Sequence, residues 1–135
     1  MCIRDRYVNN VSVTNGTNAA VTLNTNIIHT IGRRSSGSSS YFNGYMANIH
    51  FIDGQAYGPE YFAKTDTATG SWIPKDYDGT SSTGGTAVTG SIDDKYGTYG
   101  FHLDFRASSL VYSGSTLSTI NDVSGRTTPN NWTAN

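Results

Sequence analysis

The chain has 135 residues, enough for one ordinary domain with a core. Only 14% of the residues are charged and the formal net charge is −1, which excludes the basic surface needed to bind nucleic acid. The single cysteine, Cys2, excludes an internal disulfide, and no apolar run approaches the ~18 residues of a membrane span. The polarity comes from Ser, Thr, Asn and Gly, a composition typical of β-sandwiches with long loops.

The first six residues differ from the rest of the chain. Residues 1–6 hold the only cysteine and three charged side chains. They resemble a peptide translated from sequencing-adapter DNA, and we interpret them as non-native. We therefore expect the chain to be a fragment of a metagenomic sequence, with its natural beginning further upstream.

The N-terminal part is predicted to be an antiparallel meander. Residues 7–13 alternate as a strand, and Asn15-Gly16 predicts a hairpin turn because both central positions of a type I′ turn need φ > 0. Residues 19–23 return as a second strand, and residues 27–31 form a third apolar run. The Ser-rich segment 33–40 is predicted to be an exposed loop.

The clearest strand signal lies between residues 41 and 54. Asn43-Gly44 and Asp53-Gly54 are turn dipeptides at its two ends. Between them the side chains alternate, which predicts a strand with one face in a core. The apolar face holds Tyr45, Ala47, Ile49 and Phe51, and the mixed face holds Met46, Asn48, His50 and Ile52.

The second half gives shorter signals, and no helix of ordinary length is predicted. Pro59 is well placed to begin a short helical turn. Residues 71–75 are predicted to be extended and residues 79–90 to form a long loop or linker. In 101–105, Phe101, Leu103 and Phe105 face one way, as in a half-buried strand. Residues 107–119 are ambiguous, residues 121–125 form a turn, and residues 130–133 are extended.

Two stretches resemble opposite ends of a laminin-G-like, concanavalin A-like jelly roll. Residues 41–62 resemble its close: an aromatic-Asn-Gly turn, an alternating strand, a polar turn and a helical turn. Residues 100–105, followed by Asn121–Gly125 and Asn130–Thr133, resemble its opening. One departure is Arg126-Thr127-Thr128-Pro129, which replaces the usual short Gly/Asn run. The resemblance implies an all-β protein, an antiparallel β-sandwich (jelly-roll, concanavalin A-like) that is incomplete at both ends.

The resemblance also divides the chain. Residues 7–63 would be the C-terminal part of one laminin-G-like sandwich, residues 64–95 a connector, and residues 96–135 the N-terminal part of a second. The connector contains Thr65-Asp66-Thr67 and Gly70-x-Trp72-x-Pro74-Lys75. It resembles those that join tandem domains in tail-fibre and other virion structural proteins of aquatic bacteriophages.

The resemblance suggests Ca²⁺ as a possible cofactor, because laminin-G-like domains often hold this ion at a loop rim with hard oxygen ligands. Asp104 and Asp122 are the best metal candidates, with Asp53 behind them. The alternative is that each Asp forms a turn by bonding to nearby backbone. Sugar binding on such sandwiches uses exposed aromatic platforms, although aromatics beside Gly turns can instead cap the core edge. The candidate platform residues are Tyr41, Tyr57, Trp72 and Tyr99.

No catalytic arrangement stands out, and we predict that the protein is not an enzyme. The three histidines are scattered singly, and no strand carries paired carboxylates for glycoside hydrolysis. The expected function is that of a virion structural or tail-fibre protein, a homo-oligomer on the phage particle that binds host-surface carbohydrate or other virion proteins without inserting into a membrane. The alternatives are an extracellular bacterial adhesin or carbohydrate-binding module, and a fragment of a concanavalin A-like glycoside hydrolase.

Overall fold

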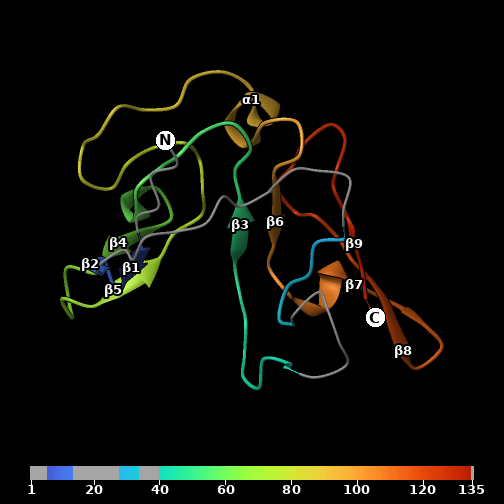
Figure 1. The fold of residues 1–135 in the computed structure, drawn as a ribbon. Helices are drawn as coiled ribbons and strands as arrows, with labels where there is room; N and C mark the ends of the chain where they lie inside the picture. The colour runs from blue at the N-terminus through green and yellow to red at the C-terminus, as the bar shows by residue number, and fades with distance from the viewer. Residues whose placement is uncertain (1–5, 14–27, 34–39, 135) are drawn as a thin grey trace.

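A computed structural model describes residues 6–13, 28–33 and 40–134 (Figure 1). This part of the chain consists mostly of short antiparallel strands with almost no helix, which is compatible with the predicted all-β class. Within the described ranges, the strands make small separate sheets of two or three strands. None of the helices found there has the length and apolar character to cross a membrane. The strands are β1 (Arg6–Val8), β2 (Val11–Val13), β3 (Ile49–Phe51), β4 (Ala63–Thr65), β5 (Trp72–Pro74), β6 (Phe101–Leu103), β7 (Leu110–Ser113), β8 (Thr116–Ile120) and β9 (Trp132–Thr133).

Strands β1 and β2 form a hairpin where one continuous strand was predicted. Asn9 and Asn10 adopt φ angles of 48° and 64°, so they make a tight turn between the two strands. Asparagine tolerates this left-handed region better than most residues, and two-residue hairpin turns need it. The prediction of a single strand over residues 7–13 is therefore wrong. The turn predicted at Asn15-Gly16 and the strand at 19–23 lie outside the described residues.

The strand predicted between residues 45 and 52 is shorter than its alternation suggested. Only Ile49–Phe51 is a strand, because Asn48 adopts a φ of 51° and interrupts the extended backbone. Tyr45 is fully exposed, so the predicted apolar face does not reach it. Residues 28–31 form no strand either, and Arg33 and Tyr41 are joined by an isolated bridge.

Strand β3 pairs with β6, two segments that are far apart in the sequence (Figure 1). The register places Ile49 opposite Leu103, His50 opposite His102 and Phe51 opposite Phe101. Phe101 and Leu103 are buried, which confirms the predicted half-buried strand over its first residues. The pairing joins two segments assigned from sequence to separate domains; the domain division itself stays a prediction.

The aromatic core lies beside this pair of strands. Tyr61, Tyr77 and Tyr96 are buried together, and two of their hydroxyls donate to backbone carbonyls, as buried tyrosine requires. Tyr61 enters the core from a 3-10 turn over Pro59–Tyr61, which confirms the predicted start at Pro59. Partly buried side chains surround the three rings: Ile52, Tyr57, Phe62, Val88 and Ile92.

A short helix, α1 (Ile92–Tyr96), places Tyr96 in the core. Ser91 and Asp94 form a capping box at its start: the Ser91 side chain accepts from the Asp94 N–H, and the Asp94 carboxylate accepts from the Ser91 N–H. The helix ends at Tyr96 and is capped by Gly97, whose φ is 77°. A Cβ at Gly97 would collide with the backbone of Asp53, and one at Gly100 would collide with the Tyr96 carbonyl.

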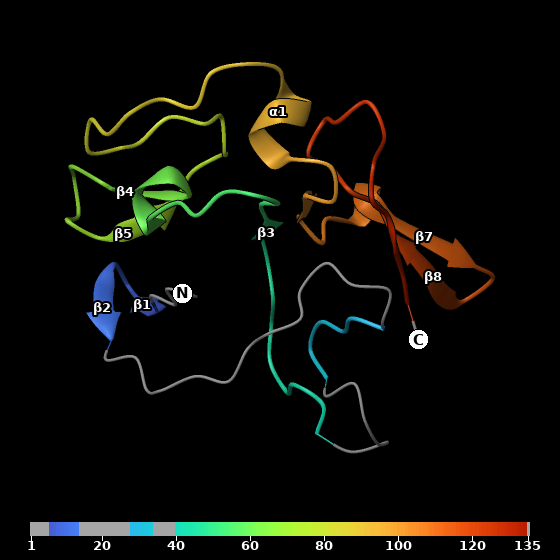
Figure 2. The ribbon, with the colours of Figure 1, turned by 45° about the horizontal axis from the view of Figure 1, so that its top comes forward.

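The ambiguous stretch 107–119 forms a 3-10 turn over Ala107–Ser109 and then most of a β-hairpin. Strands β7 and β8 pair around Gly114, which has a φ of 64°, and β9 adds to the free side of β8. Figure 2 shows this hairpin extending away from the core, on the opposite side from β4 and β5. Strands β4 and β5 pair as a third small hairpin, and β5 confirms the predicted extended segment 71–75.

Candidate functional site

An open hollow of about 250 Å³ lies beside β6 and the C-terminal end of α1. The residues around it come from segments that are distant in the sequence. Buried rings, carboxylates and a guanidinium meet there. The lining residues are Asp76, Tyr77, Tyr96, His102, Asp104, Arg106, Val123 and Ser124.

A pair of stacked histidines links the hollow to the aromatic core. The register of β3 and β6 places His50 directly opposite His102, and their ring centroids are 3.9 Å apart with the planes inclined by 19°. His50 Nδ1 lies 3.0 Å from the Tyr96 hydroxyl. His102 Nε2 lies 3.2 Å from the side-chain oxygen of Asn48. One ring nitrogen of each histidine therefore has a hydrogen-bonding partner.

The surroundings of the pair favour neutral imidazoles. Burial is the main cause that lowers the pKa of His50 to about 4; the neighbouring His102 adds to this and the Asp76 carboxylate opposes it. Burial also lowers the pKa of His102, against the opposing effect of Asp104, Asp122 and Asp76. Both rings are consequently neutral at physiological pH and present hydrogen-bonding rather than charged groups.

Asp104 holds a buried carboxylate at the edge of the hollow. Its Oδ1 accepts from the Ser109 hydroxyl at 2.5 Å and from the Arg106 N–H at 3.1 Å. The Arg106 guanidinium lies 3.3 Å from Oδ2, although most of that long side chain is exposed. Burial alone would raise the pKa of Asp104, but the Ser109, backbone and Arg106 contacts together hold it below its usual value. Asp104 is thus an anion with its own bonding partners.

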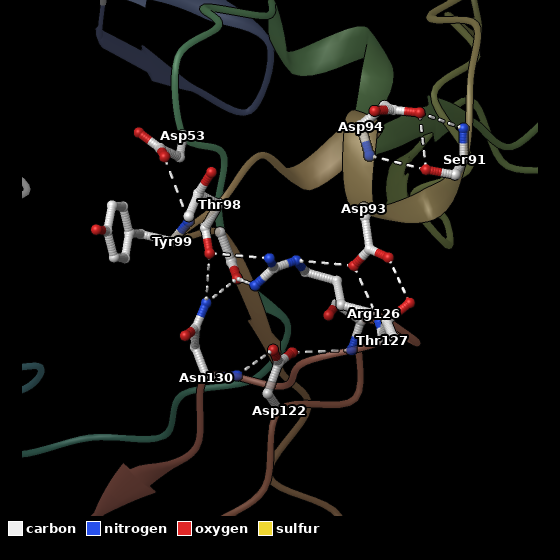
Figure 3. Close-up of polar contacts among 12 residues, drawn as sticks. Asp53, Ser91, Asp93, Asp94, Thr98, Tyr99, Asp122, Arg126, Thr127 and Asn130 are labelled. Carbon is white, nitrogen blue, oxygen red and sulfur yellow. Dashed lines mark hydrogen bonds and ion pairs between the residues drawn. The ribbon is translucent and has the colours of Figure 1, made fainter.

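Asp122 lies almost completely buried behind the hollow, and three backbone N–H groups donate to its carboxylate. These come from His102 and Ser124 to Oδ1 and from Asn130 to Oδ2, each at 2.9 Å. The side chain therefore organises the turn after β8, the structural role weighed against metal binding in the sequence. Figure 3 shows Asp122 beside Asn130, at the base of a larger polar network.

That network connects α1 to the C-terminal loop through Arg126. The Arg126 guanidinium is nearly buried and donates to the carbonyls of Thr98 at 2.8 Å and Gly100 at 3.1 Å, with its Nε 3.5 Å from Asp93 Oδ1 (Figure 3). Asp93 also accepts from the N–H and hydroxyl of Thr127. Arg126 and Thr127 belong to the stretch that departs from the jelly-roll pattern. Their contacts connect the C-terminal loop to α1 and the residues that follow it.

Ser124 supplies an unusual polar atom at the hollow. The residue is only 9% exposed, and its Oγ is buried without a hydrogen-bond partner in the described part of the chain. A buried hydroxyl without a partner costs about 1–3 kcal/mol.

The four predicted sugar-platform residues are not gathered at one place. Tyr57 packs in the aromatic core against Tyr61 and Tyr77. Tyr41 is exposed, with the Arg33 guanidinium 6.0 Å from its ring centroid. Tyr99 is exposed near α1, and its N–H donates to Asp53, whereas Trp72 lies on β5 and is half-buried. No aromatic ring contact joins any two of the four, all of which are described residues.

Asp104 and Asp122 both lie close to His102, but each carboxylate already accepts several hydrogen bonds. Within the described ranges, no group of three or more His, Cys, Asp or Glu side chains is arranged to hold a metal ion. The calcium site proposed from the resemblance stays a prediction.

Sequence reasoning missed the hollow as a whole. Asp76 was predicted to lie in a linker and Ser124 in a turn. Their neighbours in the sequence did not distinguish them from solvent-exposed polar residues. The one available signal was the Ser91-x-x-Asp94 capping box, which predicts a helix start and would have placed Tyr96. Comparison of the chain with protein-family models, with curated proteins and with solved structures finds no match.

Proposed function

We propose that this chain is part of a non-catalytic glycan-binding protein, built on a concanavalin A-like, laminin-G-like jelly roll and carried on a phage tail fibre or virion. The antiparallel, nearly helix-free described part of the chain supports the fold assignment at the level of class. The sequence resemblance supplies the jelly roll and the virion setting. The binding role rests on the hollow beside β6.

The hollow combines the groups that sugars need. Asp76 offers an exposed carboxylate and Arg106 offers guanidinium N–H donors, and both line one open space. Sugar hydroxyls both donate and accept, so such a mixed set can bind them without a metal. The surface of the hollow is mostly polar, and Tyr77, Tyr96 and Val123 supply its smaller apolar part. This convergence is the single observation that carries the proposal.

Two carboxylates in one hollow also bear on the glycoside hydrolase alternative. A hydrolase needs one carboxyl group with a raised pKa to protonate the leaving oxygen. The pKa of Asp104 is lowered instead, because Ser109 and Arg106 stabilise its carboxylate anion. This chemistry favours binding over hydrolysis.

A shallow site of this size would bind weakly. On a fibre, many copies tethered together would convert weak single sites, of about millimolar affinity, into firm attachment. The mechanism we propose is therefore multivalent adhesion, with each hollow contributing one of many contacts.

The test is a glycan array probed with the whole chain, both as a monomer and displayed on a multivalent carrier. We expect the multivalent form alone to give strong signals, and Arg106→Gln to weaken them by about fivefold or more, which corresponds to roughly 1 kcal/mol. Lys64→Gln is the matched control, because Lys64 is exposed on β4 and does not line the hollow. A folded, multivalent chain that binds no glycan would refute the proposal.

A further inference from the structure

Asn43 and Gly44 form an Asn-Gly pair on the surface, outside every strand and helix. Both residues are exposed, and no described residue hydrogen-bonds to the Asn43 side-chain amide or to the Gly44 N–H. Glycine has no Cβ, so nothing on Gly44 hinders the approach of its own nitrogen to the side chain that precedes it. The backbone nitrogen of Gly44 and the Cγ of Asn43 can therefore meet. The other Asn-Gly pair, at residues 15 and 16, lies outside the described residues.

Two similar pairs, the Asp-Gly turns at residues 53–54 and 78–79, are held in place. The Asp53 carboxylate accepts from the Tyr99 N–H at 3.2 Å, and the Asp53 N–H donates to the Tyr96 carbonyl at 2.9 Å. Asp78 Oδ1 accepts from the Thr80 N–H at 2.8 Å. These bonds must break before either side chain can turn toward the nitrogen that follows it. The structure thus separates pairs that look alike in the sequence.

We propose that Asn43 deamidates spontaneously in the folded chain, so that the Asn43-Gly44 pair is a modification site. The Gly44 nitrogen attacks the Asn43 Cγ and an N–C bond forms. The Cγ–Nδ2 bond breaks, and the side-chain amide nitrogen leaves as ammonia with the proton of the Gly44 N–H. Water then adds to either carbonyl of the resulting succinimide ring, which opens to aspartate or isoaspartate. Water is the only co-reactant, and nothing is oxidised or reduced.

The reaction changes the exposed aromatic stretch in which it occurs. It places a carboxylate between Phe42 and Tyr45 along the chain and adds one negative charge to a formal net charge of −1. Isoaspartate also lengthens the main chain by one methylene. The Phe42 ring lies against Gly44, where a Cβ would come within 2.8 Å of the ring, so a longer main chain displaces this contact. The inference is independent of the proposed glycan binding.

Incubation of the whole folded chain at mildly alkaline pH, followed by trypsin digestion and mass spectrometry, tests the proposal. The matched variant is Asp53→Asn, which places a second Asn-Gly pair where the side-chain oxygen can still accept from the Tyr99 N–H. One tryptic peptide, residues 35–64, contains both positions. In the folded variant we expect Asn43 to lose its amide about tenfold faster than position 53, because two hydrogen bonds hold the latter. In concentrated urea the two rates should be equal.

Equal rates at the two positions in the folded variant would overturn the proposal. If circular dichroism shows that Asp53→Asn does not fold, the unsubstituted chain decides instead: Asn43 should react in the folded chain within about threefold of its rate in urea, and a much slower folded-state rate would contradict the proposal. Asn43→Gln should abolish the product in this peptide, since glutamine would have to close a larger ring. A product that survives this substitution would place the reaction elsewhere and refute the assignment.

Discussion

Residues 41–48 expose large apolar side chains, whereas residues 92–131 bury several polar ones. In the first stretch large apolar side chains face water: Tyr41 is 61% exposed and Phe42 55%. In the second stretch polar side chains are buried, with Ser109 at 2% and Asp122 at 9% exposure. Hydropathy alone would have predicted the reverse arrangement.

The difference follows from the partners that each stretch finds. Around Asp122 and Arg126, backbone N–H and C=O groups point inward and need side-chain partners, so burying polar atoms satisfies other polar atoms. Among the residues that the structure describes, the stretch 41–48 makes one isolated bridge and pairs with no strand, so its aromatic rings have few partners there. Hydrogen-bonding opportunity, rather than hydrophobicity, separates the two regions.

The largest effect that would test this contrast is expected at Asp122. Asp122→Ala leaves three buried or partly buried N–H groups without their acceptor, and we expect a loss of about 3–4 kcal/mol in the free energy of unfolding. Tyr45→Ser in the exposed stretch should change it by less than about 0.5 kcal/mol. Urea denaturation followed by tyrosine and tryptophan fluorescence measures both. Equal effects at the two positions would contradict the contrast.

The next largest effect is expected at Arg126. Arg126→Met keeps the buried stem but removes the donors to Thr98 and Gly100, which should cost about 1.5–3 kcal/mol. Lysine at this position cannot reproduce the two-carbonyl geometry, so Arg126→Lys should recover only part of the loss. Lys64→Met is the control, because Lys64 is exposed on β4. A full rescue by lysine would show that charge, not geometry, holds the loop.

The smallest effect concerns pH and the histidine pair. The folded-state pKa of His50 is lowered to about 4 and that of His102 is also lowered, so between pH ~6.5 and 4 the unfolded chain binds more protons than the folded chain. Stability should therefore fall as pH decreases through this window, by roughly 1–2 kcal/mol after allowance for solvent screening.

Melting temperatures recorded between pH 7 and pH 4 measure the slope, and His50→Phe should flatten it. The nearby Asp76, Asp104 and Asp122 oppose the effect at His102, so the slope should be shallower than for two isolated buried histidines. An unchanged slope in His50→Phe would show that the pair does not control the acid response.

Much of the local structure followed from local chemistry. Pro59 predicted its 3-10 turn, and the alternation in residues 101–105 predicted a strand with Phe101 and Leu103 buried. Both signals depend on a few adjacent residues. The hairpin at Asn9-Asn10 was missed because Asn-Asn is a weaker turn signal than the Asn15-Gly16 that follows it.

The candidate site could not be predicted in the same way. Only two of its residues, His102 and Asp104, stood on a strand visible in the sequence. The pairing of β3 with β6 and the approach of Asp76, Arg106 and Ser124 depend on long-range contacts that no periodicity encodes. Asp122 was singled out as a metal ligand by resemblance, whereas its hydrogen bonds give it a role in the backbone turn.

The turn from α1 into β6 also limits how this sequence can vary through evolution. Gly97 combines a φ of 77° with direct contact against the Asp53 backbone, and Gly100 passes against the carbonyls of Tyr96 and Phe51. A methyl group fits at neither position, since backbone atoms rather than mobile side chains occupy the space. A relative that shares this junction must therefore keep two glycines three residues apart, followed directly by a short strand that begins with an aromatic residue. The sequences of its loops and its exposed aromatic residues are free to differ.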